Sequence, residues 1–129
     1  VAMADVRKEL NFCRKVGVDV LGIVENMAGF VCPCCSEKSE IFPRPAGGGA
    51  KEMSAAAEVP FLGSVPLDPR MAMACEAGES FGEAYPDSPA AAPFGAIVDS
   101  VQAATIGDAR AAGSDDEEDG EGGVVVAPA

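Results

Sequence analysis

Three cysteines lie within four residues in the segment Cys32-Pro33-Cys34-Cys35. In a chain that contains no histidine, this grouping points to metal binding or to redox chemistry. Cys32 and Cys35 have the C-x-x-C spacing, which lets two thiolates from one turn converge on a single centre. A closed thiolate site usually takes about four ligands, of which one such pair supplies about two. The source of the remaining ligands therefore decides what kind of site this is.

Three kinds of site fit this spacing. Two copies of the chain related by a two-fold axis would bring two Cys32/Cys35 pairs together, because such a contact places identical residues opposite one another. The shared thiolates could then hold a [4Fe–4S] cluster or a zinc ion. Alternatively, sequence outside this chain completes a zinc site, or the cysteines form a dithiol redox pair. A redox pair is expected at a helix N-terminus, which the residues around Pro33 do not indicate.

The other cysteines are expected to play lesser parts. Cys34 either faces away from the ligands or substitutes for one of them. Cys13 lies on the apolar stripe of a predicted helix and, like Cys75, is expected in the core. Five cysteines, an odd number, fit a disulfide framework poorly. We therefore expect a reducing compartment, most simply the cytosol.

Composition and charge exclude several classes of protein. The 129 residues suffice for one domain, and the formal charge is −12. Six of the 21 acidic residues lie in 115–121, and the remaining 15 still outnumber the nine basic ones. An acidic body argues against general nucleic-acid binding. The sequence shows no apolar run of about 18 residues and no secretory signal, so we predict neither a membrane span nor export.

The hydrophobic pattern predicts an α/β fold. Residues 5–16 read as a helix that ends at Gly17, and the apolar run 18–24 reads as a buried parallel strand. Helix followed by buried strand is the rhythm of a doubly wound sheet. The later elements predicted are a hairpin between 30–31 and 41–42, a helix over 50–57, a strand over 60–65 and a helix over 70–76. A last helix is predicted to start at Ser88 and Pro89. Its apolar stripe consists of Phe94, Ile97, Val98 and Val101. Residues 113–129 are predicted to form a disordered, acidic, glycine-rich tail.

Polar residues follow the two predicted strands. Asn26 ends the first strand, and the segment 66–69, with Pro66 and Asp68, ends the second. Ligands of open α/β sheets bind beyond the carboxyl ends of the strands, where an Asn amide could read a donor and an acceptor on a purine. The alternative is that Asn26 simply forms a turn. The run Gly47–Gly49 suggests phosphate binding, but no Gly-Lys-Ser/Thr occurs in the chain, so a flexible helix entry is favoured.

These segments together resemble one family. The ordered set GIVENM, GFVCPCC, IFP, GGG, VPFLGSVPLDPR and GESF is similar to the C-terminal half of the Mrp/NUBP-type P-loop NTPases, relatives of the ParA/MinD group that serve as iron–sulfur cluster scaffolds and carriers. The resemblance covers residues 4–106. Residues 5–15 and 85–89 look most like the cytosolic scaffold ATPase branch of this family.

The resemblance implies a site and its partners. Cys32 and Cys35 match the pair whose two copies bridge a labile [4Fe–4S] cluster between subunits. Asn26 matches the position expected to contact adenine, with Pro66 and Asp68 in the second base-side loop. The implied assembly is a homodimer, or a heterodimer or heterotetramer with a paralogous scaffold ATPase. It would pass clusters to cytosolic and nuclear apo-proteins with the help of targeting factors.

The chain also departs from the family pattern. The Walker A loop and the catalytic and switch residues would lie upstream, and the sequence starts at Val1 inside a predicted helix. We therefore expect residues 1–112 to be the C-terminal part of a P-loop NTPase domain that uses Mg-ATP in the full-length protein. This chain is not expected to hydrolyse ATP by itself, and we assign no catalytic residue here. A zinc-stabilised interaction module is the alternative function. A role in nucleotide-driven partitioning is a third, against which the thiols argue.

Overall fold

The computed structural model describes residues 2–32, 34–43, 45–111 and 123–128. At its centre lies a parallel sheet with the strand order β4-β1-β5. These strands are β1 (Val20–Asn26), β4 (Phe61–Ser64) and β5 (Gly123–Pro128). No helix in the described part of the chain is long and apolar enough to cross a membrane.

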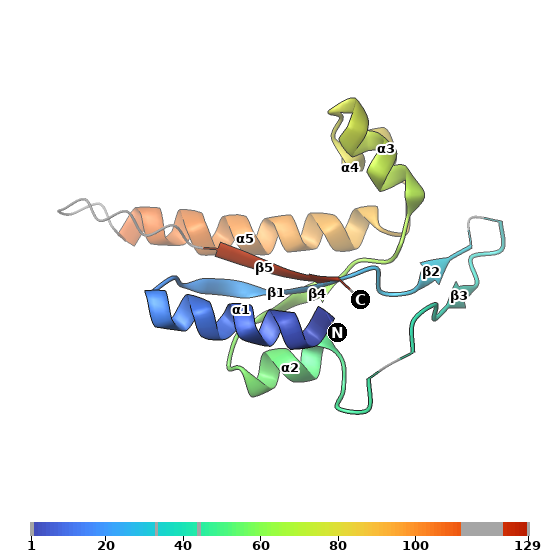
Figure 1. Ribbon diagram of the computed structural model, residues 1–129. Helices are drawn as coiled ribbons and strands as arrows, with labels where there is room; N and C mark the ends of the chain where they lie inside the picture. The colour runs from blue at the N-terminus through green and yellow to red at the C-terminus, as the bar shows by residue number, and fades with distance from the viewer. Residues whose placement is uncertain (1, 33, 44, 112–122, 129) are drawn as a thin grey trace.

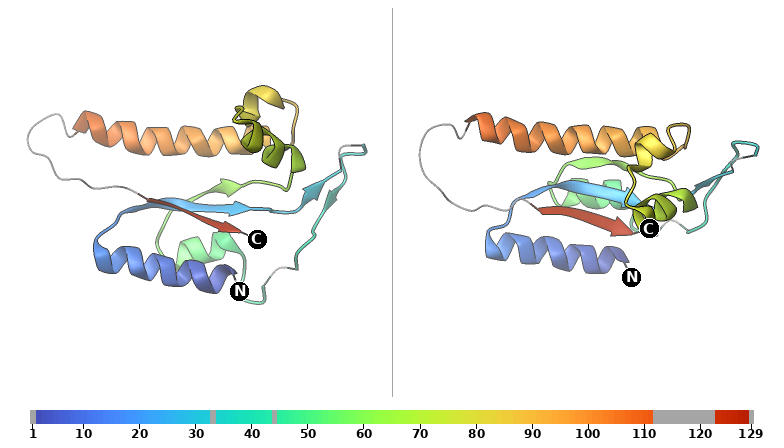
Figure 2. Two further views of the ribbon diagram at one scale, coloured as in Figure 1. Left: turned by 45° about the horizontal axis from the view of Figure 1, so that its top comes forward. Right: turned by 90° about the horizontal axis from the view of Figure 1, so that it is seen from above.

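Helices lie on both sides of the sheet (Figure 1). Helices α1 (Ala2–Val16) and α2 (Ala50–Ala56) cover one face, and α5 (Ala91–Ala111) covers the other, as the turned views of Figure 2 also show. A small two-stranded hairpin, β2 (Phe30–Val31) with β3 (Lys38–Ser39), projects beyond the carboxyl end of β1. The predicted mixed α/β class with a parallel sheet is confirmed.

Strand β1 is the centre of the core. Its side chains alternate between the two faces of the sheet, as the pleat requires. Ile23, which is fully buried, packs with Val6 and Leu10 of α1 and with Met53 of α2. Val24 packs on the other side with a second cluster that consists of Val65, Ala74, Phe81, Ala90 and Ile97. Both faces of β1 are therefore apolar and covered.

The boundary between α1 and β1 differs from the prediction by two residues. Gly17 adopts the left-handed φ of 77°, and the Val18 N–H donates to the Cys13 carbonyl at 2.9 Å. This pairing is the Schellman arrangement, which satisfies a carbonyl that the helix end leaves without a partner. Val18 therefore belongs to the helix cap, and the strand begins only at Val20.

The predicted apolar stripe of α5 faces the core only in part. Ile97 is buried, whereas Phe94 and Val98 are exposed by 40% and 38%. The close approach of α5 to β4 is made at Gly63, where an added Cβ would lie 3.1 Å from Ile97 Cγ1. Since only a glycine leaves this space, Ile97 packs directly on the strand backbone. The helix thus rests on the sheet along a narrower line than its sequence pattern suggests.

The cysteine-bearing hairpin pairs with different residues from those predicted. Phe30 lies opposite Ser39 and Val31 opposite Lys38, in antiparallel register. The expected partners, Ile41 and Phe42, are exposed and lie outside the ladder. A tight turn sets this register, because turn geometry fixes which residues of a hairpin face each other.

The segment after β4 contains two short helices, α3 (Pro69–Ala77) and α4 (Phe81–Ala84), of which only the first was predicted. The Phe81 ring of α4 is buried and meets the ring of Phe94 edge-on at 6.4 Å, so it packs this short helix against α5. Ser88 was expected to cap the last helix directly. Instead its hydroxyl accepts the Ala90 N–H at 3.1 Å in a preceding turn, and α5 begins three residues later, at Ala91.

Strand β5 corrects the prediction that all of 113–129 is disordered. It pairs in parallel with β1, with Ile23 opposite Val125 and Val24 opposite Val126. A run of β-branched valines has the composition that favours a strand beside another apolar strand. The acidic residues 115–121, on which the prediction of disorder rested, lie outside the described residues.

Candidate functional site

The cysteine turn connects β2 to β3. The Cys32 N–H donates to the Glu37 carbonyl at 3.0 Å, and the Ser36 N–H donates back to the Cys32 carbonyl at 2.8 Å. Ser36 takes a left-handed φ of 58°, which reverses the chain tightly. Cys32 is half-buried, while Cys34 and Cys35 are exposed. The turn therefore holds all three thiols in one short, accessible loop at the end of the hairpin.

The backbone of this turn favours the ionised form of one thiol. The N–H of Cys34 and, next in strength, the N–H of Cys35 donate toward the Cys32 sulfur and hold the pKa of that thiol below its ordinary value. The Cys35 thiol adds to the effect, whereas loss of solvation opposes it. The thiolate is the form that binds metals, so the turn is prepared for a soft metal ion or cluster.

A single chain does not supply a complete set of metal ligands among its described residues. Among the described residues, no group of three or more His, Cys, Asp or Glu side chains converges as a metal site would require. The three neighbouring thiols therefore do not form a ready three-ligand set. Cys75 was predicted in the core but is exposed on α3, and Cys13 is half-buried on α1. Neither belongs to the turn.

Two of the sequence-predicted base-side residues lie next to the hairpin. Asn26 ends β1, and its side-chain oxygen accepts the Met27 N–H at 2.9 Å. Met27 then adopts a left-handed φ of 54°, which turns the chain out of the sheet. Pro66 follows β4 at the same carboxyl edge. The turn-forming alternative for Asn26 is thus seen in the structure, while contact with a base stays a prediction.

Asp68, the third base-side residue, is the centre of a hydrogen-bonded network. Its carboxylate caps α3 by accepting the Arg70 N–H at 2.9 Å and forms an ion pair with the Arg70 guanidinium at 2.7 Å. The Ser88 hydroxyl donates to it from the turn before α5. Arg70 in turn lies over the Tyr85 ring, 5.4 Å from its centroid. The network fixes the loop after β4 to two later segments.

These contacts also set the charge of Asp68. The hydrogen bond from the Arg70 side chain, followed by the Ser88 and Arg70 backbone contacts, holds the carboxyl pKa well below its usual range against the opposing effect of burial. The Asp68 side chain is only 8% exposed. Its oxygens are therefore committed to the fold. Sequence reasoning missed these partners; only the Asp-Pro start of α3 gave a local signal, that of a capped helix.

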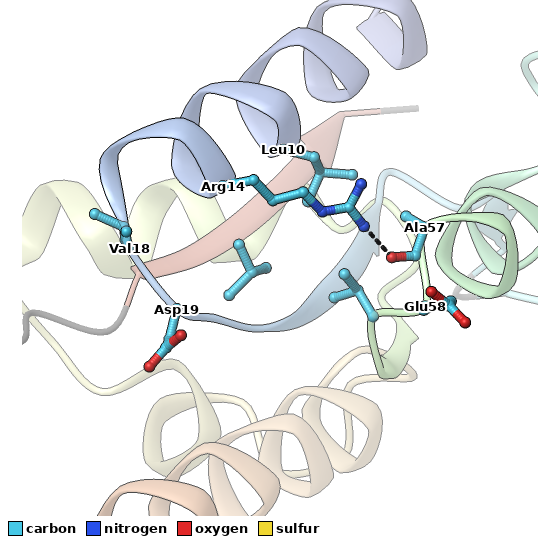
Figure 3. A pocket seen from close by; sticks show the side chains of 9 residues that line it. Leu10, Arg14, Val18, Asp19, Ala57 and Glu58 are labelled. Carbon is cyan, nitrogen blue, oxygen red and sulfur yellow. Dashed lines mark hydrogen bonds between the residues drawn. The ribbon is translucent and has the colours of Figure 1, made fainter.

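A cavity lies at the opposite end of the sheet. It has a volume of about 420 Å³ and opens where α1 ends and α2 leads into β4 (Figure 3). Arg14 reaches across it and donates to the Ala57 carbonyl. The labelled lining residues are Leu10, Arg14, Val18, Asp19, Ala57 and Glu58. None of the predicted site residues lines it, so the candidate site is the carboxyl edge with its cysteine turn.

The fold is a parallel α/β sheet whose carboxyl edge carries a cysteine-bearing hairpin and two polar loops, and open α/β sheets bind their ligands at this edge. A family model described as NUBPL iron-transfer P-loop NTPase, of the ParA group, matches residues 1–102. The chain therefore belongs to this family of iron-transfer P-loop NTPases.

Curated relatives agree with this assignment. Over 108 residues the chain is 53% identical to the cytosolic Fe-S cluster assembly factor NBP35 of Kluyveromyces lactis and 52% identical to the protein of the same name from Eremothecium gossypii. The match covers 84% of this chain and 32% of each relative. The chain thus spans about a third of the length of the relatives it matches.

Proposed function

We propose that this chain carries the cluster-binding part of a scaffold ATPase that assembles [4Fe–4S] clusters as cargo for other proteins. The observation that carries the proposal is the cysteine turn, in which Cys34 and Cys35 are exposed, Cys32 is half-buried, and the backbone favours the Cys32 thiolate. Membership of an iron-transfer family supports iron and sulfide as the load. Relatives that are named for cytosolic Fe-S cluster assembly support the same cargo and a cytoplasmic location.

The cluster in this proposal is shared between two subunits. Cys32 and Cys35 of each chain supply two thiolates, and a two-fold contact doubles them to the four that a cluster takes. The accessible position of the turn allows a second copy to approach it, either an identical chain or a paralogous scaffold ATPase. A cluster held by accessible, shared ligands can leave readily, which suits delivery to apo iron–sulfur proteins with targeting factors.

The nucleotide part of the proposal concerns the same edge of the sheet. In the complete doubly wound domain, Mg-ATP would be bound by a P-loop outside this chain, and its adenine would lie near Asn26 and Pro66. Because the Asp68 carboxylate is committed to Arg70 and Ser88, we propose that Asp68 serves the base by holding the loop in place.

Anaerobic reconstitution with iron and sulfide tests the proposal. We expect a brown protein whose absorption and Mössbauer spectra are those of a [4Fe–4S] cluster. The competing function, a zinc-stabilised interaction module, uses the same thiols. It predicts a colourless protein, purified without air, that holds zinc in stoichiometric amount and takes up no cluster. That second result would overturn the scaffold function.

A further inference from the structure

The cysteine hairpin is joined directly to the loop that follows β4. The Ala28 N–H donates to the Val65 carbonyl at 2.9 Å, and the Leu67 N–H donates to the Gly29 carbonyl at 2.8 Å. Phe30, the first residue of β2, also forms a parallel bridge with Leu67. We call these paired segments, 28–30 and 65–67, the backbone junction. It continues the β1–β4 pairing beyond the sheet to the base of the hairpin.

The junction is anchored on the side of the loop. Asp68 follows Leu67 directly, and its carboxylate is bound to Arg70 and Ser88. On the side of the sheet, the Val65 N–H donates to the Glu25 carbonyl at 2.8 Å, and the Ser64 hydroxyl donates to the Glu25 carboxylate at 2.7 Å. Residues 65–67 are thus held at both ends, and they present a fixed edge to the hairpin.

The junction also fixes the direction in which the hairpin leaves the sheet. Gly29 has a left-handed φ of 80°, and a Cβ at this position would lie 3.0 Å from the Ser39 carbonyl of β3. The β3 backbone therefore lies close against Gly29, whose own carbonyl accepts the Leu67 N–H. Only Val31 lies between Phe30, the last residue of the junction on this side, and Cys32. A shift of the Leu67 backbone would therefore move the thiols through its hydrogen bond to Gly29 and the few residues that follow.

We propose that the backbone junction is the positioning element that couples the base-side loop to the cysteine site. This inference rests on the proposed function and adds how the nucleotide site and the cluster site communicate. A ligand that orders the loop at Pro66 orients the turn that carries Cys32 and Cys35. Because coupling between two sites is reciprocal, loading the thiols must in turn restrain the junction and the loop. Leu67 acts here through its backbone N–H, as a positioning residue.

Zinc alone is a sufficient probe, since it binds thiolates and leaves nuclear magnetic resonance spectra sharp. We expect zinc loading of the ¹⁵N-labelled chain to slow hydrogen exchange at the Ala28 and Leu67 amides by about fivefold or more, the lower end of typical coupling. Leu67→Pro removes the donor of the junction. In that variant zinc is expected to protect only the turn, at the Cys32 and Ser36 amides, and to bind about fivefold more weakly. Leu67→Ala, which keeps the N–H, is the matched control and should behave as wild type.

The outcomes distinguish a failure of the coupling from a failure of the proposed function. Zinc that protects the turn of the wild-type chain but leaves the Ala28 and Leu67 exchange rates unchanged overturns the coupling and leaves the thiol site intact. A wild-type chain that binds neither zinc nor iron overturns the thiol site, and the coupling with it. The wild-type comparison decides the matter even if Leu67→Pro does not fold.

Discussion

Serine in place of both Cys32 and Cys35 is expected to lower the iron and sulfide bound after anaerobic reconstitution to background. The change removes both soft ligands, whereas the backbone bond between Cys32 and Glu37 that closes the turn does not depend on sulfur. Loss of a mere hydrogen-bond partner of a metal ligand already costs about 10- to 100-fold in affinity, so loss of the ligands costs more. Iron and acid-labile sulfide assays on gel-filtered protein measure the effect.

Two other cysteines provide controls for this prediction. Cys75→Ser is the matched control, because Cys75 is also exposed but lies on α3. Cys34→Ser examines the ligand assignment and should retain a full cluster. If Cys34→Ser lost the cluster while Cys35→Ser kept it, the second ligand would have to be reassigned from Cys35 to Cys34.

Asp68→Ala is expected to lower the free energy of unfolding by about 2 to 3 kcal/mol at pH 7, the sum of a lost helix cap and lost charge-assisted hydrogen bonds. The substitution leaves the Arg70 guanidinium and the Ser88 hydroxyl without the carboxylate that joins them. Urea unfolding followed by far-ultraviolet circular dichroism measures the change. Asp99→Ala, at an exposed site on α5, is the matched control and should stay within about 0.5 kcal/mol of wild type.

The Asp68 effect also has a defined pH dependence. Because the folded state holds the carboxyl pKa below its unfolded value, the carboxylate stabilises the fold above the unfolded value of about 3.9. This stabilisation is lost as the pH falls from there toward the folded-state pKa. The difference between wild type and Asp68→Ala should therefore be constant from pH 7 to 5 and shrink below pH 4. A difference that grew on acidification would contradict the network.

Local patterns predicted the layered part of the fold well. The spacing of Val6 and Leu10 revealed α1, and the apolar run ending at Val24 revealed β1, because one helix face and both faces of a buried strand must be apolar. Boundaries were less accurate where a cap decided them. The Schellman bond of Val18 moved the start of β1, and the turn built on Ser88 delayed α5.

Other features depend on contacts that no local pattern encodes. The register of β2 on β3 follows from the left-handed turn at Ser36, a polar residue with no special signal for it. The Asp68 network joins residues up to 20 positions apart. The cysteine pair was evident from its spacing, yet its link to the loop at Leu67 appears only when both strands are placed side by side. Spacing thus identified the candidate ligands, and the fold showed which backbone contacts position them.

The central claim is that two chains share one cluster through Cys32 and Cys35, and native mass spectrometry of the anaerobically reconstituted protein tests it most directly. Wild-type chain is mixed with an isotope-labelled chain that carries Cys32→Ser and Cys35→Ser. We predict one [4Fe–4S] cluster on each wild-type dimer and none on mixed dimers or on monomers. A cluster bound to a single chain, or carried equally by mixed dimers, would contradict the claim.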